Sequence, residues 1–125
     1  MADVEDDLPG TWVVQVTGSA GSVGKAIVTF TSAHGLVERF SGNTEGNIGV
    51  WEEADDDDRF RFMAFRYIVG PPFRNRRIRA TCKLTGTNTF TCTATLDQLD
   101  NNENPVGTAQ AGLSLNGSRL KLVRE

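Results

Sequence analysis

Two charged side chains fall where the alternation of the chain predicts an apolar strand face. Glu38 alternates with Leu36 and Phe40, and Arg66 has the same phase as the apolar residues of its own segment. A buried carboxylate or guanidinium is costly unless it is paired, so Glu38, or Glu52 from a neighbouring segment, would suit Arg66 as a partner. Inside an apolar pocket such a pair could orient a carbonyl group or shift a carboxyl pKa for acid–base chemistry.

The alternative is that these residues lie at the mouth of a barrel, where inward and outward lose their meaning. Tyr67 follows Arg66 and shares the opposite face with Met63 and Phe65. Tyr67 and Trp51 could both donate hydrogen bonds in a pocket, although amphipathic packing also explains them. The candidate catalytic residues are Glu38, Arg66 and Tyr67.

The two cysteines lie in one predicted hairpin. If the hairpin is centred on Thr87, Cys82 faces Cys92 with Cβ atoms about 4.5–5.5 Å apart, which is slightly wide for a relaxed disulfide. A cytoplasmic chain would keep both thiols reduced, as small buried apolar side chains. A catalytic thiol needs a base, and the single histidine, His34, falls in a predicted turn. Packing is therefore the role we expect for the cysteines.

Other motifs of bound ions and cofactors are incomplete. The acidic run Asp55–Asp58 lacks the glycine and the final glutamate of an EF-hand loop, and Gly18–Gly24 lacks the Lys-Ser/Thr ending of a phosphate loop. The cysteines and the histidine are too few for a metal site of nitrogen and sulfur ligands. We expect no metal and no cofactor.

Length and charge point to a single domain. The 125 residues are 23% charged and 38% hydrophobic, with a net charge of −3 and no apolar run that approaches a membrane span. Basic residues gather in the second half, but they form no basic motif of the kind found in nucleic-acid-binding proteins and the isoelectric point is acidic, so nucleic acid is not an expected partner, and neither is a membrane. Residues 1–8 are acidic and lack the apolar stretch of a secretory signal. We expect a flexible leader over 1–8, a barrel domain over 9–125 and a cytoplasmic location.

Alternation with a period of two runs through most of the chain, most regularly over Arg77–Leu96. Glycine, proline and asparagine separate the alternating segments, and Asn116-Gly117 is expected to be one of the turns. The other expected strands are Thr11–Thr17, Lys25–Ser32, Leu36–Ser41, Asn47–Glu53, Arg59–Val69, Val106–Leu115 and Ser118–Arg124. This pattern predicts an all-β fold, a single antiparallel up-and-down β-barrel of eight or nine strands. A barrel is favoured over a sandwich because closure removes exposed edges.

Small residues in the middle of the apolar face of the hairpin predict an internal cavity, with bulky aromatic residues on the opposite wall. The expected ligand-binding residues are Trp12, Phe30, Phe40, Trp51, Phe60, Phe62, Ala80, Cys82, Cys92 and Ala94.

Short motifs along the chain resemble those of a known family. Leu8-Pro9-Gly10-Thr11-Trp12, which opens a strand, resembles the Gly-x-Trp start of lipocalin-like (calycin-type) barrels, and Gly49–Glu52 and Gly117–Leu120 look like segments of small bacterial lipocalin-like proteins. The resemblance implies a barrel that binds apolar small molecules. Related barrels include cofactor-free cyclases and isomerases of natural-product pathways. Avidin-like proteins share the barrel, but their biotin-contacting Asn-x-x-Ser and tryptophan set is not found.

Two functions remain. The favoured one is cofactor-free cyclisation or isomerisation of a hydrophobic metabolite, in which holding the reactive ends together lowers the barrier by about 7–11 kcal/mol. Tyr67, Arg66 or a protonated Glu38 would polarise a carbonyl group. The alternative is a non-catalytic lipocalin-like carrier or sequestering protein for an apolar small molecule. The oligomeric state stays open, although the threonine-rich outer face at Thr91, Thr93 and Thr95 would suit a homodimer.

Overall fold

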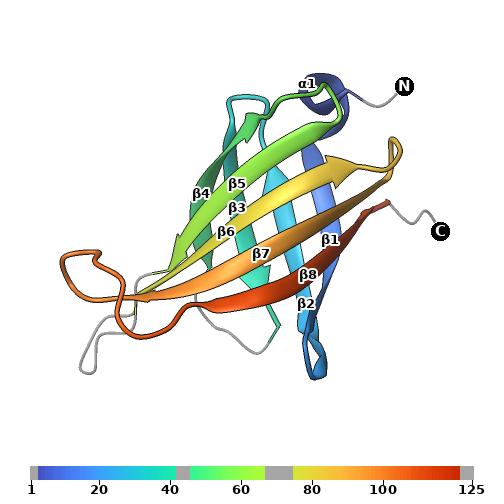
Figure 1. Cartoon of the computed structure of the whole chain (residues 1–125). Coiled ribbons are helices and arrows are strands. Elements are labelled where there is room, and N and C mark those ends of the chain that lie inside the picture. The colour runs from blue at the N-terminus through green and yellow to red at the C-terminus, as the bar shows by residue number, and fades with distance from the viewer. Residues whose placement is uncertain (1–2, 42–45, 67–74, 122–125) are drawn as a thin grey trace.

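Eight antiparallel strands form a closed barrel in the computed structural model, which describes residues 3–41, 46–66 and 75–121 (Figure 1). Each strand pairs with the next along the chain, and β1 pairs with β8 to close the sheet. The strands are β1 (Gly10–Gly18), β2 (Gly21–Phe30), β3 (Gly35–Phe40), β4 (Asn47–Glu53), β5 (Arg59–Arg66), β6 (Asn75–Leu84), β7 (Thr89–Leu99) and β8 (Gln110–Arg119). The predicted all-β up-and-down barrel is confirmed.

The two ends of the barrel differ. A helical turn, α1 (Val4–Asp7), lies across one end, which we call the closed end; the connections β2–β3, β4–β5 and β6–β7 are at this end (Figure 1). The opposite end, where β1–β2, β3–β4, β5–β6 and β7–β8 are connected, is called the open end. The start of β1 and the end of β8 both lie at the closed end (Figure 1).

Residues 3–8, which the sequence analysis assigns to a flexible leader, pack against the barrel. Val4 and Leu8 are completely buried, and the Val4 amide donates to the Asp57 carbonyl at 2.7 Å. Asp3 caps the turn because its side chain accepts a hydrogen bond from the Glu5 amide. Val4 and Leu8 are the two apolar residues of this acidic segment, and their burial holds α1 against the end of the barrel, where it forms a plug.

Aromatic rings fill the half of the barrel next to α1. Phe30 is packed edge-to-face against Phe60, Phe62 and Phe90, with ring centroids 5.8–6.1 Å apart, and Trp12 lies 4.8 Å from Phe90. Only about 20 Å³ of free space remains beside Phe30, Phe62 and Phe90. This half of the barrel is a packed core.

The last strand is continuous where the sequence predicts a turn. Asn116 and Gly117 belong to β8, which runs from Gln110 to Arg119 as one strand paired with both β7 and β1. A Cβ atom at position 117 would lie 2.3 Å from Cζ of Phe90, so this glycine makes room for an aromatic ring and not for a reversal of the chain. The barrel therefore has eight strands and not nine.

The hairpin of β6 and β7 has the predicted register, with Cys82 directly opposite Cys92. The two cysteines form a disulfide, so the expectation of reduced thiols is wrong. Their Cα atoms are 4.0 Å apart, which is close even for the closely approaching pairs of an antiparallel ladder, where this distance is about 4.5 Å.

Candidate functional site

A cavity of about 220 Å³ lies inside the open end of the barrel. Its walls are mostly aliphatic or aromatic and come from all eight strands, and its polar groups are few. The lining residues are Val16, Val23, Glu38, Phe40, Asn47, Ala64, Arg66, Arg76, Ile78, Leu96, Gln110 and Leu113. An apolar concavity with a few converging polar groups has the character of a small-molecule site.

Glu38 projects from β3 into this cavity and is only 9% exposed. The Asn47 side-chain amide donates a hydrogen bond to Glu38 Oε1 at 3.2 Å. Burial raises the pKa of the Glu38 carboxyl, and this hydrogen bond and the charge of Arg66 offset the rise only in part. The cavity therefore favours the neutral form of Glu38 and makes it a potential proton donor.

Arg66 enters the same cavity from the end of β5 and is only 7% exposed. Its buried Nε forms no hydrogen bond with any residue that the structure describes. The sequence analysis pairs Arg66 with Glu38, and the structure does bring both into one cavity. However, the charge of Arg66 acts on Glu38 through space and without a hydrogen bond between them.

Three further polar residues of the cavity lining, Asn47, Arg76 and Gln110, are missed by the sequence analysis. Asn47 carries the buried Oδ1 atom, which has no hydrogen-bond partner among the described residues. Arg76 lies directly opposite Arg66 in the β5–β6 ladder and also lines the cavity. The alternation of the strands could have identified two of these residues, since Asn47 lies on the same face of its strand as Trp51, and Arg76 lies on the apolar face of its hairpin.

The alternative partner for Arg66, Glu52, is wrong. On β4 the residues that share its face are exposed, with Ile48 at 71% and Val50 at 58%. Glu52 also points outward, where its carboxylate lies 3.5 Å from Arg61. The strand takes the opposite phase because this phase buries Trp51, the largest side chain of the segment.

Most of the expected ligand-binding residues belong to the packed half of the barrel. Phe40 lines the open-end cavity, whereas Phe30 and Phe62 border a small space of about 20 Å³ and do not line that cavity. The other buried residues of the expected set, which do not line the open-end cavity, are Trp12, Trp51, Phe60, Ala80, Cys82, Cys92 and Ala94.

The small residues of the hairpin leave no void because rings occupy the space that they free. Phe62 is directly opposite Ala80, and Phe60 is directly opposite Cys82 in the β5–β6 ladder. Large and small side chains thus alternate across the two strands, as close packing requires.

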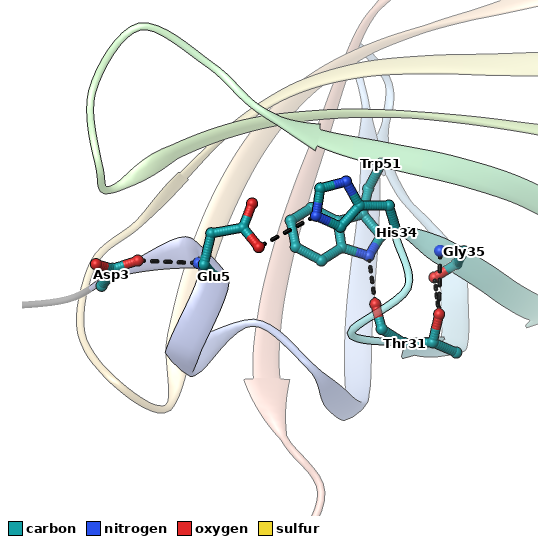
Figure 2. A network of polar contacts seen from close by, with 6 residues as sticks. All are labelled: Asp3, Glu5, Thr31, His34, Gly35 and Trp51. Carbon is teal, nitrogen blue, oxygen red and sulfur yellow. Dashed lines mark hydrogen bonds and ion pairs between the residues drawn. The ribbon is translucent and has the colours of Figure 1, made fainter.

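Trp51 has a structural role at the closed end, shown in Figure 2. Its indole nitrogen donates to the Thr31 carbonyl at 2.9 Å, and its ring lies 4.3 Å from that of His34. His34 occupies the β2–β3 turn with a φ of 69°, and its Nε2 lies 3.1 Å from Glu5 Oε2. These contacts connect α1, the turn and β4, away from the cavity.

A larger groove of about 840 Å³ crosses the outer surface of β4–β7, but it is shallow. Its two arginines, Arg61 and Arg79, are each about half exposed and already have carboxylate partners, Glu52 and Asp97. Solvated and paired charges of this kind offer a ligand little. We therefore take the open-end cavity as the candidate site.

One candidate catalytic residue and the possible metal ligands remain to be placed. Tyr67, the third candidate catalytic residue, lies outside the described residues. Within residues 3–41, 46–66 and 75–121, no group of three or more His, Cys, Asp or Glu side chains is arranged to hold a metal ion. No helix in these ranges is long and apolar enough to cross a membrane.

Neither a scan against models of protein families nor a search of curated protein sequences finds a match to this chain.

Proposed function

We propose that the barrel binds a small, largely apolar metabolite in the cavity at its open end. The observation that carries this proposal is the contrast between the two halves of the barrel. The half near α1 is filled by aromatic rings, whereas about 220 Å³ beside Glu38, Asn47 and Arg66 is unfilled. The apolar walls would hold the body of the ligand, and the polar groups would bind its head.

The volume favours a compact ligand. A cavity of 220 Å³ corresponds to about seven water molecules at liquid density. It lies below the range of about 300–1,000 Å³ that is typical of sites for drug-sized molecules. A short aliphatic chain or a single ring fits this volume better than a long polyene or polyketide.

Cofactor-free isomerisation of the bound molecule is the second candidate function, and Glu38 is the observation that favours it. Burial raises the pKa of the Glu38 carboxyl, which makes this group a better candidate than an ordinary glutamate for exchanging a proton with a ligand. Arg66, in the same cavity, would stabilise negative charge that develops on a carbonyl oxygen. If this function holds, Glu38→Gln should abolish turnover of a substrate while changing its affinity little.

The disulfide supports a location in an oxidising compartment, in place of the cytoplasm expected from the sequence. Disulfides persist in secreted or periplasmic proteins and are rare in reducing cytosol. Alkylation of the protein in intact cells, followed by mass measurement, would test this. Two alkylated cysteines would contradict it.

Binding can be tested with 1-octanol as the probe and amide chemical-shift changes in NMR as the readout. We expect the shifts to cluster around Ala64, Ile78 and Leu113, which line the cavity. Ile78→Trp should fill the cavity and abolish binding. Its matched control, Ile48→Trp, adds the same ring to the outer surface, where Ile48 is 71% exposed, and should bind normally. Equal binding by both variants, with Ile78→Trp folded, would overturn the proposal.

A further inference from the structure

Arg66 is an unusual group to leave inside a barrel. Arg66 is only 7% exposed, and its Nε has no hydrogen-bond partner among the described residues. A buried N–H group that is left without a hydrogen-bond partner costs about 1–3 kcal/mol in free energy, and more when the group is charged, so proteins normally avoid it. An anionic group bound in the cavity would remove this cost.

The surroundings of Arg66 contain little that could neutralise it. Glu38 is the only carboxyl group among the described residues that line the cavity, and its Oε1 accepts a hydrogen bond from Asn47 and not from Arg66. Arg76, directly opposite Arg66 across β5 and β6, brings a second guanidinium to the lining. The described lining therefore combines two guanidinium groups with one carboxyl group.

We propose that the ligand of the cavity carries a carboxylate, that Arg66 binds this carboxylate, and that Glu38 binds it in the protonated form. This inference rests on the proposed binding function and names the chemical class of its ligand. A guanidinium matches the planar carboxylate with two parallel hydrogen bonds. Apolar walls such as Ala64, Ile78 and Leu113 suit the hydrocarbon part of a monocarboxylic acid better than a compact, strongly hydrated phosphate ion.

Glu38 then determines how binding depends on pH. A ligand carboxylate near Glu38 adds a like charge, which favours the protonated form, and a protonated carboxyl can donate a hydrogen bond to the ligand oxygen. The proton comes from the solvent, so binding at a pH where free Glu38 is ionised takes up one proton. The charged groups that face Glu38 are Arg66 from β5 and Arg76 from β6; the described lining from β1, β2, β4, β7 and β8 contains no titratable side chain.

The test compares octanoate with 1-octanol, which have chains of the same length but differ in the head group. Calorimetry at neutral pH should give at least ten-fold tighter binding of octanoate. Arg66→Met should weaken the binding of octanoate far more than that of octanol and so remove this preference, and Arg66→Lys should retain part of it. Arg61→Met, which removes a half-exposed guanidinium from the outer surface, is the matched control and should retain the full preference.

Proton uptake is measured by repeating the octanoate titration in phosphate and in Tris, whose ionisation enthalpies differ. In a series of titrations at increasing pH, the difference between buffers should rise toward one proton per ligand as free Glu38 becomes ionised. Glu38→Gln should abolish this difference. An unchanged buffer dependence in Glu38→Gln, or none in the natural protein at any of these pH values, would overturn the role of Glu38.

The outcomes separate this inference from the proposed function. If octanol and octanoate bind equally well, the carboxylate assignment fails while the binding function stands. If neither binds, both fail. If inorganic phosphate competes with octanoate at similar concentrations, the site is a general anion site and the assignment to carboxylates fails.

Discussion

The guanidinium carbon of Arg119 lies 4.3 Å from the centre of the Trp12 ring, so the end of β8 covers the start of β1. The same guanidinium donates hydrogen bonds to the Pro9 carbonyl at 3.2 Å and the Thr87 carbonyl at 2.8 Å, and also to the Asp7 carbonyl. One side chain thus connects α1, both closing strands and the β6–β7 turn.

Replacing this side chain should destabilise the closed end. We expect Arg119→Met to lower the free energy of unfolding by about 2–3 kcal/mol, because it removes a cation–π contact and several charge-assisted hydrogen bonds. Urea denaturation measures the change. Arg59→Met, which disrupts only an exposed ion pair with Asp56, is the control. A loss no larger than that of the control would show that Arg119 does not stabilise the barrel.

The plug formed by α1 gives a second prediction. Leu8 is completely buried, so Leu8→Ala should cost about 2–4 kcal/mol through lost burial and the cavity left behind. Leu120→Ala, at a position that is about half exposed, should change stability by less than about 0.5 kcal/mol. Equal effects in thermal denaturation would mean that residues 3–8 do not close the barrel.

The disulfide should contribute measurably to stability. Cys82 and Cys92 are separated by 10 positions, and the loop-entropy relation gives about 2–3 kcal/mol for a loop of this length. We expect dithiothreitol to lower the urea midpoint of the natural protein and to leave that of the Cys82→Ala/Cys92→Ala variant unchanged. An identical midpoint with and without reductant, after reduction is verified by mass, would contradict this.

Glu38 should make stability fall as the pH rises. Its pKa in the folded protein lies above the ordinary value of 4.5, mainly because of burial, so between these two values the folded state holds a proton that the unfolded state has lost. Stability is therefore highest below the unfolded value and decreases as the pH rises through the folded value. Glu38→Gln removes this dependence, so it should gain stability relative to the natural protein as the pH increases.

Asp97 provides an opposite control for this measurement. Hydrogen bonding from Arg79 is the main cause that lowers the pKa of Asp97, so its contribution is present above the ordinary value of 3.8 and is lost as the pH falls. Unfolding curves for Glu38→Gln and Asp97→Asn across the pH range should therefore diverge from the natural protein in opposite directions. Parallel curves for Glu38→Gln would show that Glu38 titrates normally.

The part of the fold that could be predicted is the part governed by local alternation. In the β6–β7 hairpin, both faces differ clearly in polarity, and the register that places Leu84 opposite Phe90 and Cys82 opposite Cys92 is correct. The phase of β4 could not be obtained in this way. Ile48 and Val50 look like core residues, but the barrel can bury only one face of this strand, and the face with Trp51 is chosen.

The position of the cavity also depends on information that a single strand does not contain. Whether Ala80 leaves a void is decided by Phe62, which lies opposite Ala80 on β5, and by the rings that reach across the barrel from β2 and β7. The polar residues Glu38 and Arg66 were recognisable because each interrupts an apolar face. Asn47 and Arg76 do the same, but their segments have weaker patterns at the positions where the strands begin.

The closing contact between β1 and β8 has a practical consequence for handling the protein. The Leu120 amide donates to the Thr11 carbonyl at 2.9 Å, so the last described residues lie beside the start of β1 and, like α1, at the end of the barrel opposite the cavity (Figure 1). A tag, a fusion partner or a surface anchor joined ahead of α1 or after β8 would therefore connect to the barrel at the end opposite the cavity. Immobilised molecules would present their open ends to the solution in a common orientation.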